Sequence, residues 1–324
     1  MNKIWILPLE PIEQRYSKQW NQYFKKVFDD NKLNFEFVYG DIIKSNLNSK
    51  FFLDPVQTNI WKLSQLEKIL KRTTEVNNGD TIFLFDGWFP GIEALKYTFT
   101  FLQKDVKLMS YFHAGTYDKY DLTAQYGMES WGKEFENSLF SLFDKIFVAT
   151  KFHKDLILNK RIINKNKIKV VGFPLDVKNI HKQYFLGEKE NLIAFTGRKS
   201  KEKGYLDVLE LQKKGFPIII TLDKTKNKDE YYKLLAKCKY VISTANQETF
   251  GIGIVEGMAL GCIPIVPNKL SYPETVGKYV IKKDIKHDLK SILQEYQTLN
   301  PYRFIKQAQK YQYENVINKI IKYF

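Results

Sequence analysis

Short apolar runs alternate with longer amphipathic stretches along most of this 324-residue chain, and that alternation limits the possible folds more than any other feature. In the first half, the apolar runs occupy residues 3–7, 35–40, 81–86, 107–112 and 145–150. Helical patterns lie between them, near residues 13–28, 56–74, 91–102 and 129–143. Strands that alternate with helices predict βαβ units and a mainly parallel sheet.

The same rhythm returns in the second half of the chain. Apolar runs fall at residues 167–173, 192–197, 217–222, 240–244 and 263–267, with helical patterns at 204–214, 229–237 and 251–260. A polar stretch near residues 174–190, which contains Gly187, separates the two halves. We therefore expect an α/β protein with domains at 1–180 and 181–300, followed by a closing helix at 301–324.

Composition indicates a folded, globular protein. Hydrophobic residues make up 44% of the chain and charged residues 27%, which provides enough apolar surface for a large core. No uncharged run reaches the roughly 18 to 20 residues of a membrane span, and no signal-peptide core is visible, so we expect a cytoplasmic protein. Cys238 and Cys262 lie in apolar segments away from other metal ligands, which predicts buried reduced thiols.

Basic residues outnumber acidic residues by 51 to 36, which gives a net charge of +15. An excess of this size attracts phosphate-rich partners such as DNA, RNA, anionic membranes and sugar nucleotides. The excess is nearly all lysine and is accompanied by many Asn and Ile residues, so the bias of an AT-rich genome explains it equally well. The charge alone leaves the partner open.

The loop ANQETFG and the helical pattern that follows it offer the first candidate site. The start of that helix points its free N–H groups out of the carboxyl edge of the sheet, which is a ready anion site. Gly251 and Gly253 leave room for a ligand, Glu256 suits the two hydroxyls of a ribose, and Glu248 could reach the other end of the same ligand. Solvated surface carboxylates are the alternative interpretation.

The segment GRKSKEKG, residues 197–204, forms the second candidate site. It places Arg198 and Lys203 beside the start of the next helical pattern, again on the carboxyl side of the sheet. Two cations near a helix start can clamp a diphosphate. A basic solvated turn is the alternative for either residue alone, but both elements in this order within one α/β domain favour the clamp.

These two segments resemble the GR…EKG and E-x7-E segments of retaining glycosyltransferases with the GT-B fold, family four, and Glu248 and Glu256 carry the family's spacing. The resemblance covers about residues 190–275. It implies two Rossmann-like domains that face each other across a cleft, with a nucleotide sugar held mostly by the C-terminal domain. It also implies that the closing helix crosses back onto the N-terminal domain.

The resemblance further implies roles for single residues. The donor, expected to be a UDP-sugar, would be held at its diphosphate by Arg198 and Lys203, at its ribose by Glu256, and at its sugar by Glu248 with the backbone of Phe250 and Gly251. In such a transfer the leaving diphosphate can accept the acceptor's proton, so neither a nucleophile nor a cofactor is required. No Asp-x-Asp occurs, so no metal is expected. The segment between Lys203 and Glu248 is one βα unit short, which leaves base recognition open.

Three N-terminal loops leave strand ends on the cleft side and supply candidate acceptor residues. They are Glu10 and Arg15 in the first loop, Asp86, Trp88 and Phe89 in the second, and Tyr117 and Asp118 in the third. His113, also in the third loop, matches a cleft histidine of the family near the donor sugar, which implies a catalytic role. A structural role is the alternative for His113, and interdomain packing is the alternative for Trp88 and Phe89.

These loops also resemble glycosyltransferases of tailed bacteriophages that modify DNA bases. A hydroxymethylated base in phage DNA is therefore the first expected acceptor, with lysines at 165–169 and 224–228 on the DNA backbone, unless these are only solvated loops. The protein would then act in the host cytoplasm. An envelope glycan or glycolipid transferase with peripheral membrane contact, a transferase for tRNA bases and a non-catalytic binding protein remain open.

Overall fold

The computed structural model describes residues 2–11, 16–43 and 54–324, and it contains two parallel sheets. The first sheet has the order β2-β1-β3-β4-β5-β6, and all neighbouring strands run parallel. Its strands are β1 (Ile4–Leu7), β2 (Phe35–Phe37), β3 (Thr81–Leu84), β4 (Lys107–Tyr111), β5 (Lys145–Val148) and β6 (Ile168–Val170). The parallel sheet predicted from the sequence is confirmed.

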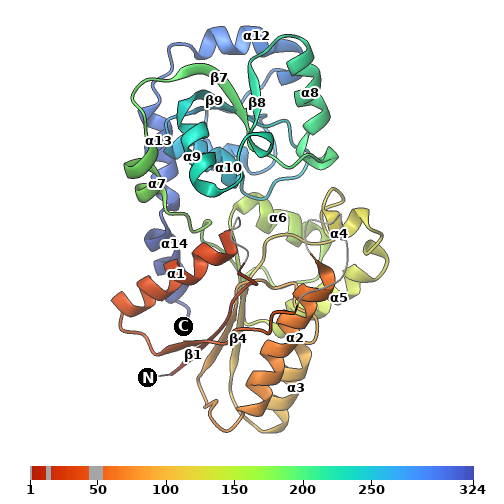
Figure 1. The fold of residues 1–324 in the computed structure, drawn as a ribbon. Helices are drawn as coiled ribbons and strands as arrows, with labels where there is room; N and C mark the ends of the chain where they lie inside the picture. The colour runs from red at the N-terminus through yellow and green to blue at the C-terminus, as the bar shows by residue number, and fades with distance from the viewer. Residues whose placement is uncertain (1, 12–15, 44–53) are drawn as a thin grey trace.

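Helices cover both faces of the first sheet (Figure 1). They are α1 (Tyr16–Asp30), α2 (Pro55–Lys71), α3 (Glu93–Phe101), α4 (Leu122–Gln125), α5 (Glu129–Leu142) and α6 (Lys151–Lys160). Successive strand residues point to opposite faces, so Phe83 belongs to the core beneath α1, whereas Ile82 and Leu84 belong to the core beneath α2, α3 and α5. This two-sided burial explains why the strands appear as continuous apolar runs in the sequence.

The second sheet has four strands in the order β10-β9-β7-β8. Its strands are β7 (Glu190–Phe195), β8 (Ile218–Ile220), β9 (Cys238–Ile242) and β10 (Ile263–Ile265). Its helices are α7 (Val177–Tyr184), α8 (Tyr205–Lys213), α9 (Lys228–Lys237), α10 (Ile252–Ala259), α11 (Tyr272–Thr275) and α12 (Ile285–Tyr296). The small sheet agrees with the short segment between Lys203 and Glu248, and both cysteines are buried free thiols as predicted.

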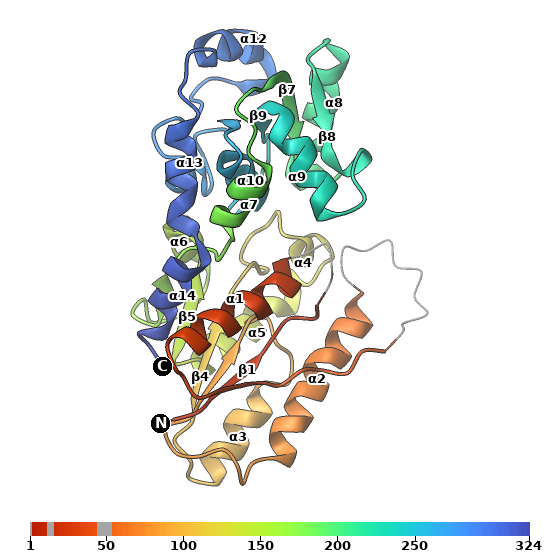
Figure 2. The ribbon, with the colours of Figure 1, turned by 60° about the vertical axis from the view of Figure 1, so that its left-hand side comes forward.

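The closing segment crosses from the second domain to the first (Figures 1 and 2). Helix α13 (Tyr302–Ala308) packs on α10, and α14 (Tyr313–Ile321) packs on α1. A 3-10 turn at Gln309–Tyr311 separates them, so the single helix expected at 301–324 is two helices. At the crossing, the Tyr313 N–H donates to the Leu175 carbonyl at 2.8 Å.

Two further features differ from the expectation. The stretch read as a polar connection contains α7, which packs on α9 and α10. Helices α6 and α12 were not expected either, although the side chain of Thr150 caps α6 and that of Asp284 caps α12. Within the described residues, no helix is both long enough and apolar enough to cross a membrane.

Candidate active site

A cleft of about 740 Å³ lies between the two domains. The carboxyl ends of both sheets contribute to it, as expected for ligand sites in open α/β sheets. Among its lining residues are Glu10, Asp86, Trp88, His113 and Asp121 from the first domain, and Arg198, Lys203, Lys228, Glu248, Phe250, Gly251 and Glu256 from the second. The two sequence segments singled out above therefore meet in one cavity.

The loop after β7 is fixed against the loop after β9 by a buried glutamate. The Glu202 side chain is 2% exposed and accepts hydrogen bonds from Ser200 Oγ at 2.5 Å and Arg198 Nη2 at 3.1 Å. Its backbone carbonyl accepts from the Gln247 N–H at 3.2 Å. Gly204 follows with φ of +73°, and a Cβ there would lie 2.2 Å from Thr244 Oγ1. The glycine of the EKG segment is thus required by the contact between the loops.

Lys203 and Glu248, which follow adjacent strands, form an ion pair of 3.1 Å. Lys203 Nζ also donates to the carbonyl and the side-chain oxygen of Gln247, both at 2.9 Å. The two side chains are 13% and 22% exposed, so the pair lies at the cleft wall and not in open solvent. The lysine is held in place before any anion arrives, which reduces the cost of ordering it.

Helix α10 is preceded by its N-cap residue Gly251, which has φ of +89°. A side chain at Gly253 would place its Cβ 2.3 Å from Thr196 Oγ1, so this glycine is required by packing against the end of β7. The sequence interpretation explained both glycines by ligand access alone. Because both residues line the cleft, the helix start still faces the cavity with free N–H groups.

The carboxylate of Glu256 is almost fully buried and already accepts three hydrogen bonds from side chains. Its Oε1 accepts from Lys228 Nζ at 2.7 Å and from the Tyr232 hydroxyl at 2.8 Å, and its Oε2 accepts from the Tyr231 hydroxyl at 2.9 Å. Burial and the nearby carboxylate raise the pKa of both tyrosines, so they remain donors. A carboxylate accepts about four hydrogen bonds. Three of these positions are already taken, so the two hydroxyls of a ribose would have to replace at least one partner of Glu256. Lys228, whose side chain is 28% exposed, is accessible for this exchange.

Sequence reasoning missed this group of donors. Lys228, Tyr231 and Tyr232 all lie in the first turns of α9, at the carboxyl side of β8. A lysine and two tyrosines at the start of a helix that follows a strand could have indicated a group of hydrogen-bond donors at the cleft. Their convergence on Glu256 depends on the packing of α9 beside α10, which a single sequence does not show.

His113 follows β4 and is surrounded by aromatic rings. Its Nε2 is 2.7 Å from the Phe85 carbonyl, which can only accept, so the proton is assigned to Nε2. Burial lowers the pKa of the imidazole, which favours the neutral form with Nδ1 as an acceptor. The rings of Tyr16, Trp20 and Tyr111 pack within 5.3 Å of it, centroid to centroid.

Contacts across the cleft tie the donor loop to the first domain. Thr249 donates from Oγ1 to the His113 carbonyl at 3.0 Å and accepts at its own carbonyl from Thr150 Oγ1 at 2.8 Å. The ring of Phe250 stacks on Phe173 with centroids 5.2 Å apart. These links hold His113 close to the loop that carries Glu248, and none of them was predicted.

The carboxylate of Glu274, in α11, forms a further contact between the domains. It accepts the backbone N–H groups of Lys151 at 2.7 Å and Phe152 at 2.6 Å, at the start of α6. A negative charge at a helix start is stabilised by the helix dipole. Helix α6 thus docks against the second domain through its N-terminus.

Three of the expected acceptor residues line the cleft. Asp86 pairs with the buried Lys62 at 2.7 Å, Glu10 Oε2 accepts from Thr58 Oγ1 at 3.4 Å, and Trp88 lies beside them with its ring N–H directed to Glu136. These contacts hold the side chains of Asp86, Glu10 and Trp88 in place. Arg15, which was expected beside Glu10 in the first loop, lies outside the described residues.

Contrary to the prediction, Phe89, Tyr117 and Asp118 do not fit an acceptor site, because all three residues are buried. Phe89 is 2% exposed inside the core of the first domain, and Tyr117 is 3% exposed with its hydroxyl 2.6 Å from His153 Nε2. Asp118 is 7% exposed and is absent from the lining of the cleft, where Asp121 takes its place. Burial raises the pKa of Asp121, and the charges of Arg198 and Lys203 oppose that effect.

The two expected lysine clusters lie at different places. Lys226 and Lys228 line the cleft. Residues 165–169 precede or begin β6, which puts them at the amino edge of the first sheet, opposite the cleft. One polyanion at the cleft would not contact both clusters. Within the described ranges, no group of three or more His, Cys, Asp or Glu side chains is arranged to hold a metal ion.

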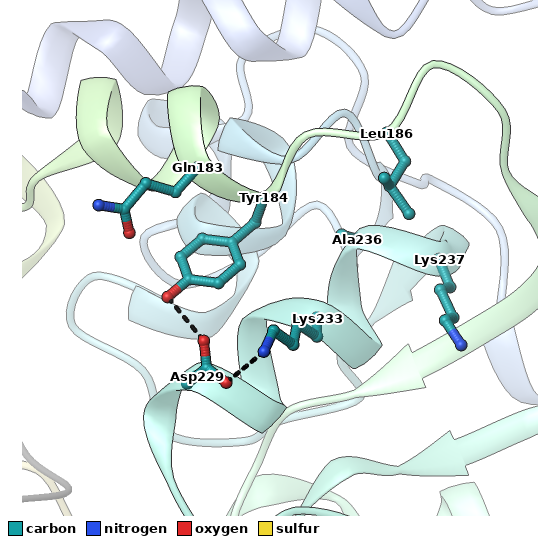
Figure 3. Close-up of a pocket in the computed structure, with 7 residues that line it drawn as sticks. All are labelled: Gln183, Tyr184, Leu186, Asp229, Lys233, Ala236 and Lys237. Carbon is teal, nitrogen blue, oxygen red and sulfur yellow. Dashed lines mark hydrogen bonds and ion pairs between the residues drawn. The ribbon is translucent and has the colours of Figure 1, made fainter.

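A second pocket, of about 540 Å³, lies between α7 and α9 and shares no lining residue with the cleft (Figure 3). Asp229, one of its lining residues, accepts from the Tyr184 hydroxyl at 3.1 Å and pairs with Lys233 at 2.7 Å. Lys237 lines its rim. Asp229, the only acidic residue among the described residues that line it, is therefore already paired, and none of the residues predicted for the site lies in this pocket.

Comparison with solved structures defines the class of fold. The structure of sucrose-phosphate synthase from Thermosynechococcus elongatus superposes with a TM-score of 0.70 at 11% identity, over 99% of this chain and 98% of that one. The lipopolysaccharide outer core galactosyltransferase WaaB superposes with a TM-score of 0.63 at 13% identity, over the whole of both chains. The chain has the GT-B fold of two Rossmann-like domains, as predicted, with the C-terminal helix crossing back.

Sequence comparison points in the same direction. Residues 218–314 match the family model of glycosyl transferases group 1. A tRNA-queuosine alpha-mannosyltransferase from Drosophila melanogaster is 49% identical over 51 residues, which are 16% of this chain and 14% of that relative. The match thus spans a small part of the curated relative. Fold and family match together support a glycosyltransferase enzyme.

Proposed function

We propose that the protein is a retaining glycosyltransferase that moves a sugar from a nucleoside diphosphate sugar, in the first instance a UDP-sugar, to a hydroxyl acceptor. One observation carries the proposal. Arg198, Lys203, Glu248 and Glu256, which are spread along the chain, line the same cleft at the carboxyl edge of the second sheet. Two cations and two acids beside a helix start are suited to a diphosphate flanked by a ribose and a sugar.

In this proposal the cations act on the leaving group. The bond between the sugar's C1 and the diphosphate oxygen breaks, the bond from C1 to the acceptor oxygen forms on the same face, and the diphosphate takes the acceptor's proton. Arg198 and Lys203 stabilise the negative charge that develops on the diphosphate, so the scheme requires no cofactor or metal. Lys203 is already aimed by Gln247 and Glu248.

Glu248, Phe250 and Gly251 are proposed to hold the donor sugar, and Glu256 the ribose. His113 would act at the sugar as a neutral acceptor at Nδ1, because its Nε2 proton is engaged by Phe85. Such a role positions a sugar hydroxyl and does not transfer the reaction's proton. The hydrogen bond from Thr249 to the His113 carbonyl supports this arrangement, because it holds His113 beside the donor loop.

For the acceptor, we propose a hydroxyl on a nucleic-acid base, with a hydroxymethylated base of phage DNA as the first candidate. The net charge of +15 and the exposed lysines of the loop after β8 support a polyanionic acceptor. A tRNA base is the second candidate, favoured by the 51-residue similarity to a tRNA-modifying mannosyltransferase. Transfer to an envelope glycan or glycolipid would replace these two candidates, and so would a non-catalytic role.

A transfer assay tests the proposal. The protein is incubated with radiolabelled UDP-sugars and GDP-sugars against hydroxymethylated DNA, plain DNA, tRNA and a lipid extract, and the labelled polymer is identified. We expect label in one nucleic acid, with the anomeric configuration of the donor retained. Arg198→Ala and Lys203→Ala should each lower turnover by roughly 100-fold. The control is Lys199→Ala, which removes a neighbouring lysine paired with Asp223. Label in lipid alone, or equal turnover in all variants, would contradict the proposal.

A further inference from the structure

The side chain of Trp88 is fixed on the cleft wall by a buried ionic network. Its ring N–H donates to Glu136 Oε1 at 2.8 Å, and the same oxygen accepts the Thr116 N–H at 2.6 Å. Glu136 is fully buried, and its Oε2 accepts from Arg161 Nε at 2.6 Å. Because the ring N–H is engaged behind the cleft, the indole of Trp88 is held in one orientation.

A second indole extends this surface outward from the cleft. The ring centroid of Trp131 lies 5.7 Å from that of Trp88, and Phe135 packs edge-on against Trp88 at 4.8 Å. Trp131 is 49% exposed, which is unusual for so large an apolar side chain. It lies in the first turn of α5, three residues after Met128, which lines the cleft, whereas Trp131 lies outside the lining. We call Trp88 and Trp131 the tryptophan platform.

The charges around the platform indicate where the phosphates of a nucleic acid would bind and where they would not. Asp86 and Glu136 beside Trp88 are neutralised by Lys62 and Arg161. On α5, Glu129 and Glu134 are exposed, and Lys133 pairs with Glu134 at 4.0 Å. The remaining charge of Glu129 repels phosphates, so α5 does not attract a sugar-phosphate backbone. Across the cleft, the loop between β8 and α9 exposes Lys224 and Lys226, which attract a backbone. Figure 1 shows α4, just before α5, on the side of the first domain that faces the second.

We propose that the tryptophan platform stacks an unpaired base of the nucleic-acid acceptor, while Lys224 and Lys226 hold the adjacent phosphates. This inference rests on the proposed function and names how its acceptor is held. Stacking on a fixed ring costs little side-chain entropy and accepts any base. A base in a duplex would have to leave the stack to reach the platform, so unpaired strands bind more tightly.

The test measures binding of a fluorescein-labelled 15-nucleotide single-stranded DNA by anisotropy. Trp131→Ala should weaken binding by about tenfold or more, because a stacked base is lost. Trp131→Leu, which preserves apolar packing against Trp88, should weaken it similarly. The matched control is Phe101→Ala, an exposed aromatic residue on α3 that is 77% exposed and absent from the cleft lining. An abasic strand of equal length should bind the native protein as weakly as the normal strand binds Trp131→Ala.

Affinity for UDP, measured in parallel by calorimetry, separates this inference from the proposed function. If UDP binds equally to all variants and only the Trp131 variants lose single-stranded DNA, the platform is supported. Equal DNA affinity of Trp131→Ala and native protein would overturn it, even if sugar transfer is observed. Equal binding of normal and abasic strands would also overturn it, as would acceptor activity restricted to a glycan. If the native protein bound neither UDP nor GDP, that result would instead count against the proposed function.

Discussion

The carboxylate of Glu256 accepts three hydrogen bonds from side chains of α9, so ligand binding at this residue requires an exchange of partners. Glu256→Gln keeps the size of the side chain but replaces one acceptor with a donor that opposes the tyrosine hydroxyls. We expect affinity for UDP to fall by about tenfold or more in calorimetry. Glu188→Gln, in the exposed loop before β7, is the control. Unchanged affinity would remove Glu256 from the donor site.

A second prediction at the residue scale concerns the buried His153. Burial lowers its pKa to about 3, well below that of an exposed histidine, so the unfolded chain binds a proton first as the pH falls. The stabilisation is complete above about pH 6.5 and is lost as the pH falls towards 3. The free energy of unfolding should therefore drop by about 2 kcal/mol between pH 7 and pH 5 from this group.

His153→Phe keeps a ring in the same space and removes the titration. Denaturant unfolding at pH 7 and pH 5 should show a smaller loss of stability in this variant than in the native chain. Part of the loss will persist, because burial also lowers the pKa of His113. The same loss in both proteins would show that His153 is not a neutral buried group.

At this scale the sequence predicted the residues that follow strands and missed those that depend on packing. Lys203 and Glu248 could be placed together because they follow β7 and β9, which are adjacent in the sheet. Phe89 and Tyr117 also follow strands, yet their side chains turn into the core. The direction of a loop side chain depends on neighbours that are distant in sequence, which a strand-end argument does not include.

At the scale of elements, the donor loop after β9 is joined to the first domain by Thr249. Its hydroxyl donates to the His113 carbonyl, and its carbonyl accepts from Thr150, the N-cap of α6. Thr249→Val should lower kcat/KM about fivefold to tenfold, since one hydrogen bond that aligns the two sides is lost. Thr249→Ser should restore most of the activity. Steady-state kinetics with native-like activity for the valine variant would show that this contact does not align the site.

The elements themselves were predicted well because both faces of each sheet are covered. Strands such as β3 and β9 consist mostly of apolar residues, and the helices between them have clear amphipathic patterns. Helix α7 was missed because its segment is mostly polar, with only Val177 and Ile180 buried. The break between α13 and α14 was missed because both halves continue the same apolar spacing. It lies where the chain passes from one domain to the other.

At the scale of the whole molecule, the basic charge has a testable meaning. If the lysines of the loop after β8 hold phosphates, the affinity for single-stranded DNA should fall steeply with salt. Replacing Lys224 and Lys226 together by Ala should reduce the slope of log K against log salt by about 1 per lysine. Lys237→Ala, at the pocket in Figure 3, is the control and should leave the slope unchanged. An unchanged slope in the double variant would place the phosphates elsewhere.

The central claim is that a nucleoside diphosphate binds in the cleft between the two domains, at the start of α10. The most direct measurement is a crystal structure of the protein soaked with UDP and, separately, with GDP. The account predicts electron density for one nucleotide with its diphosphate within hydrogen-bonding distance of Arg198 and Lys203 and its ribose at Glu256. Density in the pocket between α7 and α9, or a nucleotide in the cleft that touches none of these side chains, would contradict it.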